Sequence, residues 1–147
     1  MSDGGGARIA AAFAGSGKRA ALMPYLMGGY PDLETSRRIG EACVDAGADI
    51  LELGVPFSDP LADGPVIHAA ATAALRAGVT VASVLDVAAG LAPRVPIVLM
   101  TYVNTVLAPG VERFLDRLAA CGVSGLIVPD LPLEEAGEIA DAAERAG

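Results

Sequence analysis

The chain has little of several residue types on which whole classes of protein depend. Its 147 residues include two cysteines, one histidine, one lysine and no tryptophan. Cys43 and Cys121 both fall in segments with a helical pattern, so we expect buried, reduced thiols. A disulfide framework or a zinc knuckle is not the pattern seen here. His68 has no cysteine or carboxylate partner nearby in the sequence, and it is interpreted as an ordinary helix residue.

Positive charge and long apolar runs are also scarce. Ten Lys and Arg stand against 18 Asp and Glu, which gives a net charge of -8. Such a chain repels phosphate backbones and anionic lipid head groups, and this argues against nucleic-acid and membrane-surface binding. No apolar run approaches the ~18–20 residues of a membrane span, and the N-terminal part has no secretory-signal pattern. We therefore expect a cytoplasmic protein, and the 53% hydrophobic content suffices for one globular domain.

Short apolar runs alternate with amphipathic stretches from Ala20 onward. This alternation is typical of βα units around a parallel sheet. The four predicted strands cover residues 21–27, 49–53, 96–101 and 125–128. Pro24 lies inside the first run and would interrupt a central strand, so this strand is the least secure. Before it, we expect a flexible tail over residues 1–7 and a short Ala-rich helix over 9–14.

Helix boundaries are marked between the runs. Asp32 and Thr80 are predicted N-caps, and Gly47 supplies a residue for the turn after the first of these helices. Two more helices are predicted, one from Val111 to Gly122 and one from about Leu133 to Ala143. A (βα)8 TIM barrel uses roughly 31 residues per unit, so residues 21–147 accommodate four units. The predicted fold is therefore α/β, with four βα units that form half of a TIM barrel.

Three carboxylates lie close together after the second predicted strand: Glu52, Asp59 and Asp63. In parallel α/β folds, functional groups gather at the carboxyl ends of the strands. Two carboxylates in a partly dry pocket have their pKa values pushed apart, which produces one proton donor and one ionised group. The pattern predicts an acid/base pair, and an acidic surface loop is the alternative.

The segment that contains these carboxylates resembles a known family signature. Residues 51–65 read LELGVPFSDPLADGP, a long and specific string similar to the tryptophan synthase alpha chain family. The likeness extends to MPYLMGGYP at 23–31, PIVLMTYVN at 96–104 and VPDLPLEE at 128–135. It covers the chain from about Ile9 to its last residue.

The resemblance implies a TIM-barrel lyase of tryptophan biosynthesis that needs no cofactor or metal of its own. Such a lyase cleaves indole-3-glycerol phosphate to indole and glyceraldehyde 3-phosphate by a retro-aldol step. By this likeness, Glu52 protonates the indole ring carbon and accepts the hydroxyl proton of the glycerol chain, while Asp63 stabilises the positive charge at the ring nitrogen. The four positions that match the indole-packing residues of the family are Tyr25, Ile67, Met100 and Tyr102.

The resemblance also implies a protein partner. Asp59, Asn104 and Pro132 match positions at the face that docks the beta subunit, in an α2β2 tetramer. Pyridoxal phosphate belongs to that beta subunit, which consumes the indole.

The chain departs from the family in one respect, because it stops at Gly147, where a fifth strand would begin. The phosphate site of such barrels is built by loops after strands 7 and 8, so we expect residues 1–147 alone to be inactive. A non-catalytic half-barrel or assembly module is the alternative, as is another phosphate-binding barrel enzyme. A Schiff-base aldolase would need a lysine at a strand end, but Lys18 precedes the first strand. Residues 15–20 also lack the context of a nucleotide-binding loop.

Overall fold

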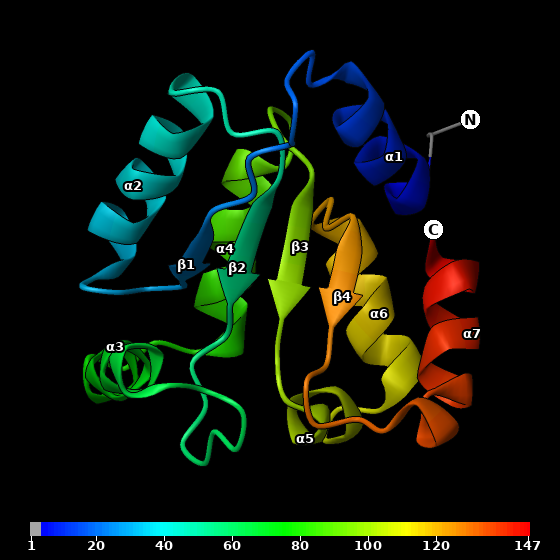
Figure 1. Cartoon of the computed structure of the whole chain (residues 1–147). Coiled ribbons are helices and arrows are strands. Elements are labelled where there is room, and N and C mark those ends of the chain that lie inside the picture. Colours follow the sequence, from blue (N-terminus) through cyan, green and yellow to red (C-terminus); the bar gives the residue numbers. More distant parts are fainter. Residues whose placement is uncertain (1–3) are drawn as a thin grey trace.

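A computed structural model describes residues 4–147 and contains one parallel sheet (Figure 1). Its strands run in the order β1, β2, β3, β4, and every neighbouring pair is parallel. Their bounds are β1 (Tyr25–Met27), β2 (Leu51–Gly54), β3 (Ile97–Met100) and β4 (Gly125–Ile127). All four predicted strands are confirmed, each shorter than its apolar run.

The helices alternate with the strands, as the sequence pattern predicts. They are α1 (Gly5–Gly15), α2 (Leu33–Asp45), α3 (Pro65–Arg76), α4 (Val81–Leu91), α5 (Val103–Leu107), α6 (Val111–Ala120), the 3-10 helix η1 (Leu133–Glu135) and α7 (Gly137–Ala146). The short α5 was not predicted, and the fourth predicted helix is divided into η1 and α7. No single helix within residues 4–147 is long and apolar enough to cross a membrane. Helices α3 and α4, which are bent by 108° relative to each other, have the required length and composition only when taken together.

The predicted start of the first helix is wrong. Helix α1 begins at Gly5, so residues 5–7 are helical, and residues 1–3 of the expected tail lie outside the described part of the chain. Gly5 is buried against the backbone of Ser124, and an added Cβ would lie 2.3 Å from the Ser124 carbonyl oxygen. A residue with a side chain would not fit this close approach to Ser124, so tertiary packing rather than helix propensity decides the residue at this position.

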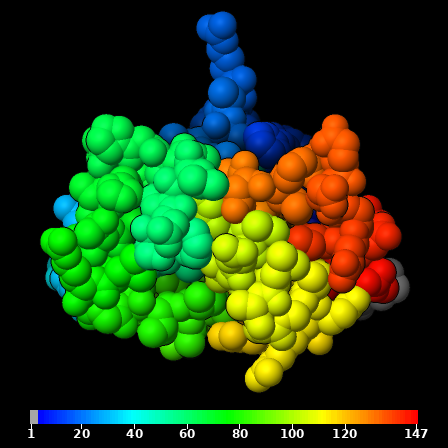
Figure 2. Space-filling view, turned by 90° about the horizontal axis from the view of Figure 1, so that it is seen from below, coloured from blue at the N-terminus to red at the C-terminus, as the bar shows by residue number. Residues whose placement is uncertain are grey.

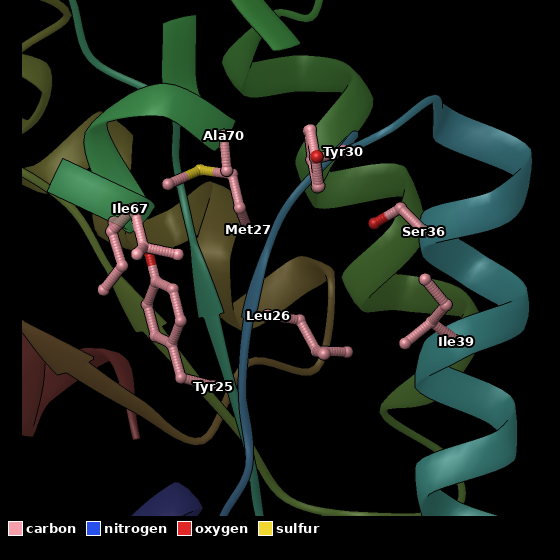
Figure 3. Close-up of a pocket in the computed structure, with 9 residues that line it drawn as sticks. Tyr25, Leu26, Met27, Tyr30, Ser36, Ile39, Ile67 and Ala70 are labelled. Atoms are coloured by element: carbon pink, nitrogen blue, oxygen red, sulfur yellow. The ribbon is translucent and has the colours of Figure 1, made fainter. Parts of the chain in front are cut away.

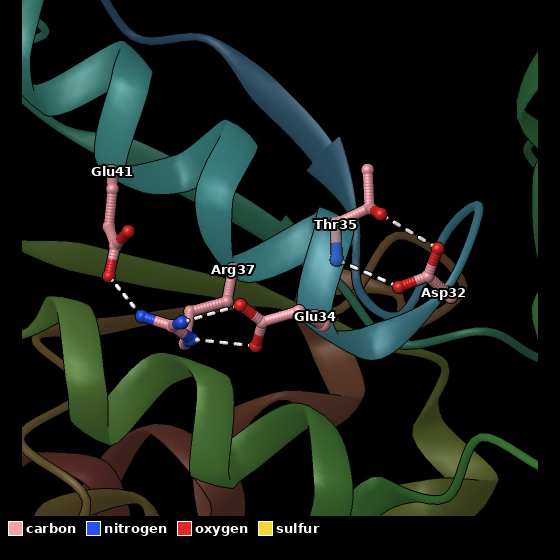
Figure 4. Close-up of polar contacts among 5 residues, drawn as sticks. All are labelled: Asp32, Glu34, Thr35, Arg37 and Glu41. Atoms are coloured by element: carbon pink, nitrogen blue, oxygen red, sulfur yellow. Dashed lines mark hydrogen bonds and ion pairs between the residues drawn. The ribbon is translucent and has the colours of Figure 1, made fainter.

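The predicted caps are confirmed, and Figure 4 shows the one at Asp32. The Asp32 carboxylate accepts hydrogen bonds from the Thr35 amide at 2.8 Å and from its hydroxyl at 2.7 Å. Both hydrogen bonds lower the pKa of Asp32, and the bond from the Thr35 amide has the larger effect. Thr80 and Ser83 form a reciprocal capping box at the start of α4. Gly47 has φ +91°, a conformation that favours glycine after a helix.

The hydrophobic core lies between the sheet and its helices. Leu51, Leu53, Ile97 and Leu99 are at most 2% exposed and share one cluster with α4, α6 and α7. Side chains alternate along a strand, so the residues between these leucines and isoleucines face away from that core. The opposite face of the sheet therefore carries Tyr25, Glu52 and Met100.

Arg8 of α1 ties together the ends of two helices. Its guanidinium donates to the carbonyl oxygen of Ala92, the C-cap of α4, at 2.5 Å and to that of Gly122, just after α6, at 3.2 Å. A cation is favourable at a helix C-terminus, where carbonyl groups lack helical partners.

Replacing Arg8 by methionine should therefore destabilise the fold. Hydrogen bonds to a charged group contribute about 1.5–3 kcal/mol each, and partial solvation reduces this, so we expect a loss of about 1–3 kcal/mol. Thermal unfolding checks the prediction, with Arg38→Met on the exposed side of α2 as the matched control. Equal unfolding midpoints for the two variants would contradict it.

Candidate active site

The carboxyl ends of the four parallel strands lie at one end of the sheet (Figure 1), and the predicted acid/base residues lie on β2 and in the loop after it. Tyr25 on β1 lies opposite Glu52 on β2, and Glu52 lies opposite Val98 on β3. Residues in this register share a face, and neighbouring strands are about 4.8 Å apart. Glu52 is therefore flanked by the Tyr25 side chain on one side and by the Val98 and Met100 side chains on the other.

Glu52 is the half-buried carboxyl that the sequence predicts. Burial raises the pKa of Glu52, because the charged carboxylate loses part of its hydration. Val98 and Met100 are each 8% exposed and supply apolar surface on the same face. The expectation of a drier carboxyl at the strand end agrees with the direction of this shift.

The loop after β2 is held over the end of β3 by Tyr102. The amide of Ala62 donates to the Tyr102 hydroxyl at 3.0 Å, and the Phe57 ring stacks on the Tyr102 ring with centroids 5.1 Å apart. Burial raises the pKa of Tyr102, and the Asp63 carboxylate next to it adds to the effect. These contacts place Asp63 on the same side of the sheet as Glu52.

Tyr25 is near both predicted catalytic carboxylates. Burial raises the pKa of Tyr25 most, followed by the negative charges of Asp63 and then Glu52. Its ring extends from β1 towards Ile67 in the first part of α3 (Figure 3). Of the six predicted catalytic and substrate-binding residues, the structure thus gathers Tyr25, Glu52, Asp63 and Tyr102 around the end of β2, with Ile67 and Met100 beside them.

A pocket of about 220 Å³ borders only part of this cluster. Tyr25 and Ile67 line it, together with Leu26, Tyr30 and Ile39, while Glu52, Met100 and Tyr102 do not. Side chains from β1, α2 and α3 surround this space (Figure 3). It therefore lies beside the edge strand β1, and neither predicted catalytic carboxylate lines it.

The three predicted partner-facing residues are exposed on the loops at the same end of the sheet. Figure 2 views this end and shows the loop after β2, the region of α5 and the segment after β4 as neighbours. Asp59, Asn104 and Pro132 belong to these three segments and are all exposed. The Asp59 carboxylate accepts a hydrogen bond from the Ser58 hydroxyl at 2.6 Å, and among the described residues it makes no hydrogen bond or ion pair with the Glu52 cluster.

Two residues that position the site were missed in the sequence. Phe57 stacks on Tyr102, and the Asp130 carboxylate accepts a hydrogen bond from the Val103 amide at 2.8 Å. Asp130 follows β4, so the rule that selected Glu52 after β2 could have identified it. The Phe57 stack joins residues 45 positions apart, and no local pattern signals it.

The remaining candidates have unremarkable surroundings. Cys43 and Cys121 are free thiols that are partly buried rather than fully buried, and both pack against the core. His68 is exposed on α3. Within residues 4–147, no group of three His, Cys, Asp or Glu side chains could hold a metal ion.

Together, the parallel sheet, the covering helices and the polar strand ends define an α/β protein of the TIM-barrel class. A family model for the tryptophan synthase alpha chain matches residues 12–147. The alpha chain of Synechococcus elongatus is 53% identical over 131 residues, which are 88% of this chain and 49% of that protein. The alpha chain of Gloeobacter violaceus is 50% identical over an alignment of 144 positions, and the match covers 95% of this chain and 52% of that protein.

Solved structures agree with these sequence relatives. A crystal structure of tryptophan synthase from M. tuberculosis superposes with a TM-score of 0.90 at 44% identity, over 95% of this chain and 57% of that one. The tryptophan synthase α2β2 complex from Pyrococcus furiosus gives a TM-score of 0.81 at 37% identity, over 86% of this chain and 52% of that one. The chain belongs to the tryptophan synthase alpha chain family and spans about half the length of the relatives it matches.

Proposed function

We propose that this chain supplies the acid/base half of a lyase that cleaves indole-3-glycerol phosphate to indole and glyceraldehyde 3-phosphate. The observation that carries the proposal is the placement of two carboxyl groups, Glu52 and Asp63, near the partly buried side chain of Tyr25. Glu52 is half-buried at a strand end and has a raised pKa, while Asp63 comes from a loop. Two carboxyl groups in different surroundings can divide the work of proton donor and charge stabiliser.

The proposed reaction transfers two protons and breaks one carbon–carbon bond. Protonated Glu52 donates its proton to the indole ring carbon that carries the glycerol chain, and the Asp63 carboxylate stabilises the positive charge at the ring nitrogen. Glu52 then accepts the proton of the adjacent chain hydroxyl. The bond between ring and chain breaks, its electron pair neutralises the ring, and the hydroxyl carbon becomes the aldehyde. Glu52 ends protonated, as it began.

Apolar surface beside Glu52 suits a flat aromatic ligand. Met100 and Tyr102 are almost fully buried, at 8% and 1% exposure, and Ile67 is half-buried on α3. An indole ring gains free energy from such surroundings because its apolar faces leave water. Tyr25, Ile67, Met100 and Tyr102 are therefore the proposed substrate-binding residues.

The two outer strands of the sheet have unpaired edges within residues 4–147, which supports the proposal that this half-barrel needs further strands to complete it. Within the described residues, β1 pairs only with β2, and β4 pairs only with β3. Ile127 on β4 is 37% exposed, and an apolar hollow of about 300 Å³ lies beside β4, next to η1 and α7. In a closed barrel, further strands would cover these edges, and the later loops would bind the phosphate. Residues 1–147 alone should therefore cleave little substrate.

Growth of a bacterium that lacks its own alpha chain tests the proposed function. The chain should restore growth without tryptophan when it is expressed together with the C-terminal half of the Gloeobacter violaceus alpha chain. We refer to this pair as the completed enzyme. Added indole should restore growth in every strain, which shows that the later step is intact. If the pair assembles and growth still requires indole, the chain is a non-catalytic half-barrel module.

The exposed residues Asp59, Asn104 and Pro132 form the proposed docking face for a beta subunit. A shallow hollow of about 650 Å³ beside Phe57 and Asn104 adds apolar surface to this face. Because the loop that carries Asp59 also carries Asp63, docking on Asp59 would influence the proposed active site.

Asp59→Ala should accordingly weaken the stimulation of cleavage by the beta subunit more than the basal rate. The side chain is exposed and outside the Glu52 cluster, so basal cleavage should change by less than about twofold. Indole release by the completed enzyme, with and without beta subunit, measures both rates, and Asp116→Ala on exposed α6 is the control. Equal losses of basal and stimulated rates would contradict the docking role.

A further inference from the structure

The Tyr25 hydroxyl is a buried polar group that the fold leaves without a partner. Its oxygen has almost no exposed surface and makes no hydrogen bond within residues 4–147. A buried hydroxyl without a partner costs about 1–3 kcal/mol relative to one that is hydrogen-bonded. Buried polar groups are satisfied in the great majority of cases, so this exception requires an explanation.

The surroundings of the hydroxyl place it in the proposed site. The oxygen lies against Gly54, where an added Cβ would be 2.0 Å away, so only glycine leaves room for the phenol at the end of β2. Tyr25 is in register with Glu52, and the charges of Asp63 and Glu52 both act on its phenol. A tyrosine phenol is protonated at neutral pH, so its hydroxyl can donate a hydrogen bond.

We propose that the Tyr25 hydroxyl donates a hydrogen bond to the substrate chain hydroxyl that Glu52 deprotonates. This inference rests on the proposed function and adds a polar role to a residue otherwise assigned to ring packing. A neutral donor beside a general base can hold the hydroxyl oxygen while the base takes its proton. Tyr25 and Ile67 line the same pocket, and the ring of Tyr25 points towards Ile67 (Figure 3).

Tyr25→Phe tests this inference, because it removes only the hydroxyl. The first readout is thermal unfolding of the 147-residue chain. Loss of an unpartnered buried hydroxyl should leave the unfolding midpoint unchanged or raise it. A clear decrease would show that the fold itself uses the hydroxyl, and this would overturn the inference. Tyr30→Phe is the matched control, since Tyr30 lines the same pocket but is 45% exposed.

The second readout is ligand binding to the completed enzyme, followed by ligand-observed NMR with two probes. Indole-3-glycerol carries the chain hydroxyls, and 3-propylindole lacks them. Tyr25→Phe should weaken binding of the first by about 3–10-fold, as expected for one neutral hydrogen bond, and leave the second within about twofold. Equal effects on both probes would overturn the inference alone. If the completed enzyme with unmodified Tyr25 binds neither probe, the proposed function fails, and the inference fails with it.

Discussion

Glu52→Gln should reduce cleavage of indole-3-glycerol phosphate by the completed enzyme about 10²–10⁴-fold. The substitution keeps the size of the side chain but removes the proton that the carboxyl group donates and recovers, and loss of a general acid/base typically costs this factor. Indole release at saturating substrate is the measurement. Glu138→Gln, an exposed position in the first turn of α7, is the control and should retain full activity.

The same variant should be at least as stable as the unmodified chain at neutral pH. Burial raises the folded-state pKa of Glu52 above its ordinary value of 4.5, so the folded state binds more protons than the unfolded state just above that pH. The stability therefore falls as the pH rises through this window, and glutamine removes that part of the dependence. Normal turnover in Glu52→Gln, or lost turnover explained by unfolding, would refute the assignment.

Asp63→Asn should lower kcat of the completed enzyme by about 10²–10³-fold, the effect of removing one electrostatic stabiliser from a transition state. The carboxylate comes from the loop that Tyr102 holds over β3, and asparagine can keep polar contacts while losing the charge. The unfolding midpoint should change little, because the residue is not part of the hydrophobic core.

Steady-state cleavage and thermal unfolding together distinguish the two roles of Asp63. Asp86→Asn on the exposed side of α4 is the control, and it should alter neither quantity. An Asp63→Asn protein that unfolds early yet retains its specific activity would make Asp63 a structural residue of the loop.

Local features account for the parts of the fold that could be predicted from the sequence. Asp32 and Thr80 cap helices through bonds to residues three positions away, and Gly47 adopts a backbone conformation of its own. Pro24 lies just before β1, where its missing amide proton is harmless, and its carbonyl oxygen accepts a bond from the Glu52 amide at 3.0 Å. Each of these signals is contained within a few residues.

The features that could not be predicted depend on distant contacts. The helical start at Gly5 depends on its fit against Ser124, and the loop after β2 depends on the Tyr102 hydroxyl, 40 residues from Ala62. The five-residue α5 is too short to show a helical period. The strand-end rule selected Glu52 as a candidate, but the unpartnered Tyr25 hydroxyl could be recognised only from three-dimensional packing.

The central claim is that this chain carries the acid/base chemistry of an alpha-chain lyase. The most direct test measures indole and glyceraldehyde 3-phosphate together, from indole-3-glycerol phosphate supplied to the completed enzyme. We predict that both products appear in equal amounts, only when both halves are present, and that Glu52→Gln in this chain abolishes both. Equal product formation by the C-terminal half alone, or by the Glu52→Gln pair, would contradict the account.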